Sequence, residues 1–191
     1  YLTEGITAPN LALIDHLQAP SRAAAALAEH PWNVVILQQG PTTIGLCRDS
    51  LVLWTKLFDS LIVKAGARTA LMMTWPPRER WTALEETRLS YAAAAAAVHG
   101  IFLPVGEALG LVRDAARPAL LAADGFHPSA LGSFLAALTI YERLSGRDLR
   151  RLDRGRLASS ARLVRSARRR VRAISTSPPS SRRTSSGPRI R

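Results

Sequence analysis

Cysteine, histidine and long apolar runs are scarce in this sequence. It has one cysteine and four histidines in 191 residues, and these are not spaced as the ligands of a metal site are. The single cysteine, Cys47, excludes a disulfide bond within the chain. No apolar run reaches the 18 or more residues that indicate a membrane-spanning helix. A glycine-rich phosphate-binding loop is also missing. We therefore expect neither a metal nor an organic cofactor.

Positive charge is concentrated at one end of the chain. The sequence has a net charge of +12, yet residues 1–146 hold 11 Lys and Arg against 12 Asp and Glu, whereas residues 147–191 hold 15 Arg against 2 Asp. The first part is predicted to be a folded domain. The second is predicted to be a disordered, Arg/Ser/Pro-rich basic tail, because it offers too little apolar surface to offset the entropy of ordering it.

Segments with strand-like and helix-like patterns alternate along the predicted domain. Continuous apolar runs predict buried strands over residues 34–37, 70–73 and 101–103. Apolar residues at helical spacing, with capping and stop residues, predict helices near residues 21–30, 49–65, 81–98, 104–115 and 128–146. Residues 11–14 suit an edge strand or a loop. This alternation predicts an α/β protein, with a doubly wound parallel sheet and helices on both faces.

One short motif combines an acid and a histidine at a spacing that suggests chemistry. Residues 124–129 read Asp-Gly-Phe-His-Pro-Ser. The glycine allows a tight bend, so Asp124 and His127 can point the same way, and His127 is expected at the N-terminus of the helix that follows. This arrangement is half of a serine-hydrolase triad. In the alternative, purely structural interpretation, Asp124 caps the helix and His127 packs beside it.

Polar segments follow the predicted strands, and the carboxyl ends of parallel strands meet at one edge of a sheet, where functional residues gather. Gln38 and Gln39 follow the first strand and could donate an amide N–H to a developing oxyanion, or they could only satisfy the loop backbone. Trp75 follows the second strand and is a candidate wall of a substrate cleft.

Four segments together resemble the SGNH (GDSL-type) hydrolase superfamily. They are residues 32–41, 70–76, 103–108 and 124–129, and the resemblance extends over residues 9–146. It implies a three-layer α/β/α sandwich with a flavodoxin-like parallel sheet. It also implies that Asp124 and His127 are the catalytic acid and base of a serine esterase, with a small-molecule or carbohydrate ester as substrate.

The sequence departs from this family in two places. The family's nucleophilic serine stands in a Gly-Asp-Ser or Gly-Asn-Ser segment after the first strand, and no such segment occurs here. Ser50 is preceded by Asp49 but lies too late in the chain, where we interpret it as a helix cap. The family's oxyanion residues are also not clearly matched, so Gln38, Gln39 and Asn10 are only candidates.

These observations lead to a main hypothesis and an alternative. The main hypothesis is an SGNH-type serine esterase that lacks its first strand and nucleophile segment, and is therefore inactive in this form. The alternative is a non-catalytic α/β binding domain whose basic tail contacts nucleic acid or an anionic surface through counterion release. The tail has no aromatic residues to stack on bases, which counts against nucleic acid.

Overall fold

The computed structural model describes residues 2–18, 21–40, 45–116 and 120–149. The predicted disordered tail lies almost entirely outside these ranges. Within them, none of the helices combines the length and the apolar character that a membrane span requires.

Three short parallel strands form the sheet. β1 (Val34–Leu37), β2 (Arg68–Met72) and β3 (Ile101–Leu103) lie in the order β1-β2-β3. Helix α2 (Gly45–Lys64) connects β1 to β2, and α3 (Leu84–Ala97) connects β2 to β3. The remaining elements are the helices α1 (Ala23–Glu29), α4 (Val105–Ala116) and α5 (Ala130–Ser145) and the 3₁₀ helices η1 (Leu13–Leu17) and η2 (Arg78–Ala83).

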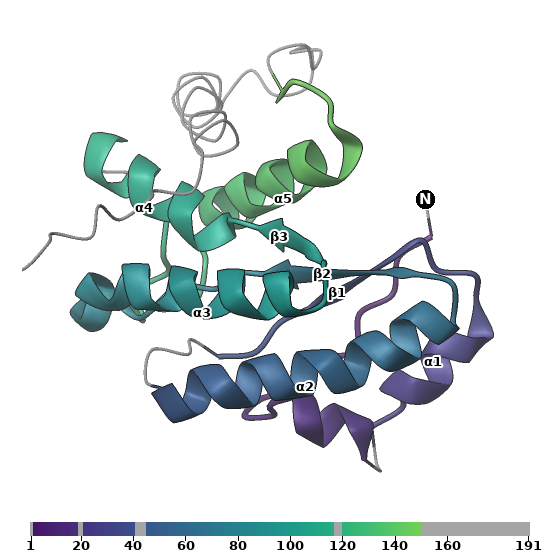
Figure 1. Cartoon of the computed structure of the whole chain (residues 1–191). Helices are drawn as coiled ribbons and strands as arrows, with labels where there is room; N and C mark the ends of the chain where they lie inside the picture. Colours follow the sequence, from purple (N-terminus) through teal and green to yellow (C-terminus); the bar gives the residue numbers. More distant parts are fainter. Residues whose placement is uncertain (1, 19–20, 41–44, 117–119, 150–191) are drawn as a thin grey trace, which may run out of the picture.

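The central strand, β2, shows why helices cover both faces of the sheet. Successive side chains of a strand point to opposite faces. Leu71 and Met73 are buried in a cluster with α2 and α3, whereas Met72 packs on a second cluster formed mainly by α4 and α5. Helices α2 and α3 lie side by side, as do α4 and α5 (Figure 1). The predicted α/β architecture with helices on both faces is therefore confirmed.

Strand β1 is the less protected edge of this sheet. Among the described residues it pairs only with β2. Val35 packs against the α2–α3 cluster, whereas Ile36 points to the other face and is 40% exposed. Within the described residues, this strand thus combines an unpaired sheet edge with an exposed apolar side chain.

Several predicted element boundaries are wrong. Residues 11–14 do not form an edge strand, because the 3₁₀ helix η1 begins at Leu13 and covers the second half of that run. Helix α1 begins at Ala23, and its N-cap position is Arg22 rather than Ser21, although the Ser21 hydroxyl does accept a hydrogen bond from the Ala23 N–H. The predicted helix over residues 81–98 is divided into η2 and α3.

Helix α2 differs most from its prediction. It begins at Gly45, about one turn before the predicted start. Ser50 therefore lies inside the helix, where its hydroxyl donates to the Leu46 carbonyl at 2.8 Å, and it is not a cap. The predicted stop is correct: Gly66 follows the helix with φ +78°, a left-handed conformation that glycine adopts without strain.

The folded body extends slightly beyond the predicted boundary at residue 146. Gly146 ends α5 in the left-handed conformation, as the sequence predicts. Three residues later, Leu149 is only 1% exposed and packs with Leu138 of α5. Leu149, which the sequence placed in the tail, is therefore part of the core.

Candidate active site

The loop before α5 brings Asp124 and His127 together. Oδ2 of Asp124 lies 2.7 Å from Nδ1 of His127. The other carboxylate oxygen, Oδ1, accepts hydrogen bonds from the backbone N–H groups of Phe126 at 2.9 Å and His127 at 3.0 Å. Gly125 makes this tight turn with φ +70°. The carboxylate is therefore bonded to the histidine through one oxygen and to the loop backbone through the other.

This geometry differs from the helix-capping interpretation. Helix α5 begins at Ala130, and its cap is Ser129, whose hydroxyl accepts from the Gly132 N–H at 3.2 Å. Asp124 does not cap the helix, and His127 lies three residues before its first turn. The expectation that His127 lies at the helix N-terminus is wrong, because Pro128 and the cap residue Ser129 separate it from the first residue of α5.

The histidine is accessible to other molecules. Its side chain is 72% exposed, and that of Asp124 is 49% exposed. Within the described ranges, the ring forms its one hydrogen bond through Nδ1, to Asp124. The opposite nitrogen, Nε2, remains available to exchange a proton with a bound group, which is the role that a general base requires.

The pKa of Asp124 is lowered from 3.8 to about 2. The main cause is the hydrogen bond from the Phe126 N–H, followed by the hydrogen bonds from His127, all of which favour the ionised carboxylate. The Asp124 carboxylate is therefore ionised over the pH range in which a histidine exchanges its proton.

We expect Asp124→Asn to remove part of the stability that depends on pH. A lowered pKa in the folded state stabilises the fold above the ordinary carboxyl pKa, about 3.9, and this stabilisation is lost as the pH falls toward 2. Wild type should unfold at higher urea concentration than the variant at pH 6, and the difference should shrink between pH 4 and about 2. Asp49→Asn, which removes an exposed carboxylate on α2, serves as the control. If the difference in urea midpoint between wild type and Asp124→Asn stays the same from pH 6 to pH 2, the pKa of Asp124 is not lowered in the folded state.

Gln39, one of the oxyanion candidates, is fixed in place, whereas the other two are exposed. The Gln39 side chain is mostly buried, and its Oε1 accepts a hydrogen bond from the Leu13 N–H at 3.1 Å. Because the oxygen is used in this way, the amide has its N–H₂ group to offer a ligand. Gln38 is exposed, and Asn10 is exposed with φ +60° in the turn before η1. The oxyanion role of all three stays a prediction.

Two residues that the sequence analysis did not single out hold the backbone of Gln39. The buried hydroxyl of Tyr91 donates to the Gln39 carbonyl at 2.6 Å and accepts from its N–H at 3.2 Å. Thr74, at the end of β2, lies 3.5 Å from both the Tyr91 hydroxyl and the Gln39 carbonyl. Burial raises the pKa of Tyr91, so its hydroxyl stays protonated and can donate. Thr74 belongs to a polar segment at a strand end, but nothing in the sequence marks Tyr91 as more than a core residue.

Trp75 directly contacts the loop that carries Asp124 and His127. It is 8% exposed, and its indole N–H donates to the Phe126 carbonyl at 2.9 Å. Trp75 therefore links the carboxyl end of β2 to the loop that carries His127, and its neighbour Thr74 links the same strand end to Gln39. The predicted role of Trp75 in a substrate cleft stays a prediction, and its small exposed area leaves little surface for contact with a substrate.

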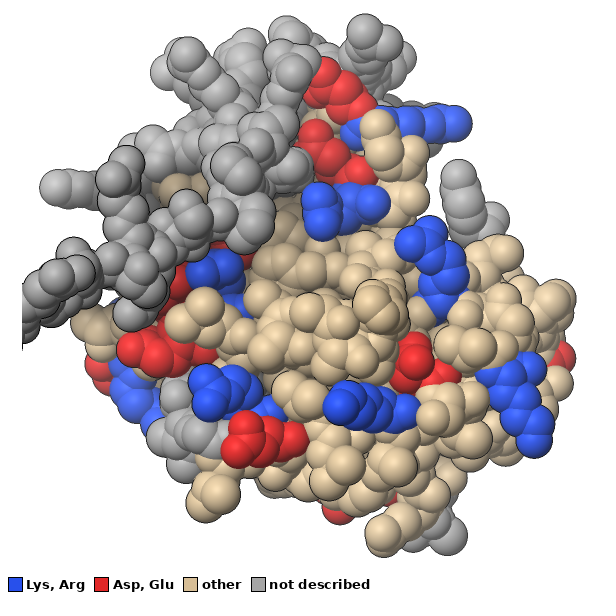
Figure 2. Space-filling view, viewed as in Figure 1, with Lys and Arg blue, Asp and Glu red and all other residues tan. Residues whose placement is uncertain are grey.

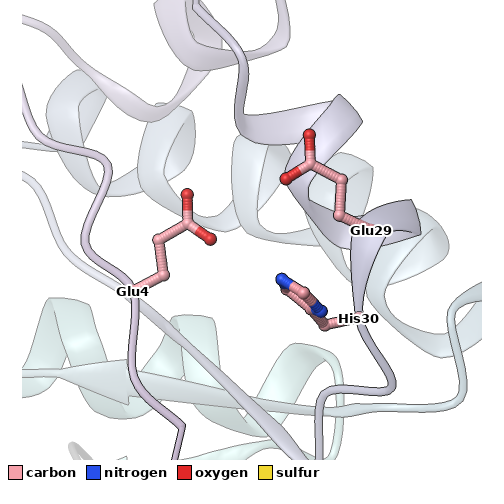
Figure 3. Close-up of side chains that lie close together, drawn as sticks. All are labelled: Glu4, Glu29 and His30. Atoms are coloured by element: carbon pink, nitrogen blue, oxygen red, sulfur yellow. The ribbon is translucent and has the colours of Figure 1, made fainter.

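A separate cluster of potential metal ligands lies far from this loop in the sequence. Glu4, Glu29 and His30 approach one another at the surface (Figure 3), with one ligand atom of each within 4.8 Å of the others. However, the guanidinium of Arg22 binds both carboxylates at 2.6 Å. The charge that a metal ion would supply is therefore provided by the chain itself.

The arrangement of the sheet, the two helical layers and the loop before α5 define an SGNH-hydrolase-like α/β fold. A candidate SGNH hydrolase from Slackia heliotrinireducens is similar to this chain with a TM-score of 0.59 and 27% identity, over 71% of this chain and 80% of the other. A DUF4886 family protein from Bacteroides uniformis is similar with a TM-score of 0.62 and 17% identity, over 80% of this chain and 66% of the other; at that identity it supports the fold alone. Neither a protein-family model nor a curated protein matches the sequence.

Proposed function

We propose that this chain carries the acid and base of an SGNH-type serine esterase that acts on a small-molecule or carbohydrate ester. The observation that supports this most strongly is the 2.7 Å contact between Asp124 and Nδ1 of an exposed His127. The similarity to the Slackia protein is consistent with it.

In this mechanism a serine hydroxyl attacks the carbonyl carbon of the ester. Nε2 of His127 takes the serine proton, and Asp124 holds the Nδ1–H and stabilises the cation that forms. The tetrahedral intermediate collapses to an acyl-serine as its bond to the alkoxide oxygen breaks, and that oxygen takes the proton from Nε2 and leaves as the alcohol. Water then attacks the acyl group by the same route. The Gln39 amide is our candidate donor to the oxyanion.

The nucleophilic serine of this proposal comes from a strand that pairs with the open edge of β1. Within the described residues, no serine forms a hydrogen bond with His127, and Ser50 is bonded inside α2. An added strand would extend the sheet beside β1 and shield Ile36. Because that strand would end at the same edge of the sheet as β1, its following serine would lie near the loop of His127.

The test measures hydrolysis of p-nitrophenyl acetate. We expect the 191-residue chain to hydrolyse the ester no faster than its His127→Ala variant does. A chain preceded by a strand ending in Gly-Asp-Ser should hydrolyse the ester, and His127→Ala in that longer chain should lower kcat by at least about 10³-fold. If the 191-residue chain is active and loses its activity on Ser50→Ala or Ser129→Ala, the nucleophile lies within this chain. Activity that survives His127→Ala would contradict the assigned base.

The described residues give no support to the alternative of a nucleic-acid-binding domain. Lys and Arg side chains are interspersed with Asp and Glu on the face in view, and they do not form a continuous basic surface (Figure 2). Of the 15 arginines on which that alternative depends, all except Arg147 lie beyond residue 149, outside the described part of the chain.

A further inference from the structure

The segment that follows β2 binds the carbonyl groups of Gly125 and Phe126, the two residues between Asp124 and His127. The indole N–H of Trp75 donates to the Phe126 carbonyl at 2.9 Å, and the backbone N–H of Arg78 donates to the Gly125 carbonyl, also at 2.9 Å. A Cβ atom placed on Gly125 would lie 3.3 Å from Cβ of Arg78, so the two backbones are in close contact. These contacts join segments about 50 residues apart.

The same two peptide groups bind Asp124 from their other side. The peptide between Gly125 and Phe126 offers its carbonyl to Arg78 and its N–H to Asp124. The peptide between Phe126 and His127 offers its carbonyl to Trp75 and its N–H to Asp124. Because a peptide group is planar, holding its carbonyl fixes the direction of its N–H. The segment after β2 therefore orients both donors that hold Oδ1 of the carboxylate, and this leaves Oδ2 for His127.

We propose that Trp75 is a positioning residue of the Asp124–His127 pair, which it orients through the Phe126–His127 peptide, with the Arg78 N–H acting in parallel on the preceding peptide. The catalytic meaning of this inference rests on the proposed function, but the positioning itself does not. Trp75 is suited to this task because its ring is anchored in the α4–α5 cluster, and a buried indole N–H requires an acceptor. The lowered pKa of Asp124, whose largest cause is the Phe126 N–H, agrees with two well-aligned donors.

The test replaces the indole with a ring that lacks the N–H. In Trp75→Phe, we expect the pKa of Asp124, followed by carboxyl ¹³C NMR, to rise by about half a unit to one unit. We also expect the ¹⁵N shifts of His127 to show a smaller population of the Nδ1–H tautomer. Trp32→Phe is the matched control, because the Trp32 indole also donates to a backbone carbonyl, that of Ala26, at 2.7 Å, but away from the loop. Equal changes in both variants, or no change in a folded Trp75→Phe protein, would overturn the proposal.

A second pair of variants covers the case in which Trp75→Phe does not fold. Arg78→Pro removes the N–H that binds Gly125, whereas Arg78→Ala keeps it, so their difference reports this single hydrogen bond. Pro77 has φ −61° and ψ 160°, which a following proline tolerates. We expect the Asp124 pKa to rise in Arg78→Pro but not in Arg78→Ala, and identical values would overturn the proposal.

The NMR results and the esterase test can fail independently. If the Asp124 pKa rises as expected but the extended chain hydrolyses no ester, the positioning role stands and the proposed function fails. If ester hydrolysis depends on His127 but the NMR values do not change, the proposed function stands and the positioning role fails.

Discussion

Replacing Gly106 with alanine is expected to lower the free energy of unfolding by about 3 kcal/mol, the upper part of the usual range for overpacking a core. Gly106 lies in the first turn of α4, against the end of β2, and its N–H donates to the Met73 carbonyl at 3.1 Å. A Cβ atom there would collide with the backbone carbonyl of Thr74 and with Cε of Met73. The Thr74 carbonyl is part of the backbone that follows β2, so it cannot move aside as the end of a flexible side chain could. Helix propensity would favour alanine by only about 1 kcal/mol.

Gly110→Ala is the matched control, because it makes the same change one turn later in α4. There the added Cβ would meet Cδ2 of Leu84 at 2.7 Å, the end of a flexible side chain that can move. We expect Gly110→Ala to be close to neutral in urea unfolding followed by circular dichroism. Equal stabilities of the two variants would show that α4 can shift away from β2, contrary to the close backbone contact described above.

Replacing Tyr91 with phenylalanine is expected to cost about 1–3 kcal/mol, the penalty for leaving buried polar groups without partners. The ring would keep its packing, because Tyr91 is fully buried among α2, α3 and the sheet. The loss concerns the carbonyl and the N–H of Gln39, both of which the hydroxyl now satisfies. Thr74 lies 3.5 Å from the same carbonyl and can replace only part of this bonding.

Tyr141→Phe provides the comparison for Tyr91. Its hydroxyl receives a long contact of 3.5 Å from the exposed Arg147 guanidinium, and the side chain is half-buried. This variant should change the urea midpoint very little. If Tyr91→Phe is no less stable than Tyr141→Phe, the prediction is wrong. In that case water or a rearranged Gln39 provides new partners for the carbonyl and the N–H of Gln39.

The sequence predicted the order of the elements and the contact between Asp124 and His127 correctly, because both depend on local patterns. Continuous apolar runs identified β1 and β3 within their observed bounds. The spacing of Asp124 and His127 around a glycine predicted their contact, since three residues across a tight turn leave little freedom. Apolar periodicity identifies which side chains are buried, and the short Asp-x-x-His spacing brings its two side chains within reach of each other.

The parts of the site that depend on distant segments could not be predicted in this way. Nothing local indicates that the Tyr91 hydroxyl bonds to Gln39, or that the Trp75 N–H bonds to the loop of His127. Helix α2 began earlier than predicted because Gly45 and Leu46 carry no capping signal, and the helix continues through them without one. Tertiary packing determines which groups form these hydrogen bonds, and the periodicity of apolar residues does not encode it.

The separation of these partners along the chain has a consequence for folding. The hydrogen bonds that surround the site span 26 residues from Leu13 to Gln39, 52 from Gln39 to Tyr91 and 51 from Trp75 to Phe126. Contacts of this range form only after large loops have closed, and loop closure is entropically costly and slow. The Asp124–His127 turn, in contrast, can form transiently at any stage. A rigid site therefore exists only in chains that have completed the parallel sheet, and slow hydrogen exchange at the loop amides would report the last step of folding.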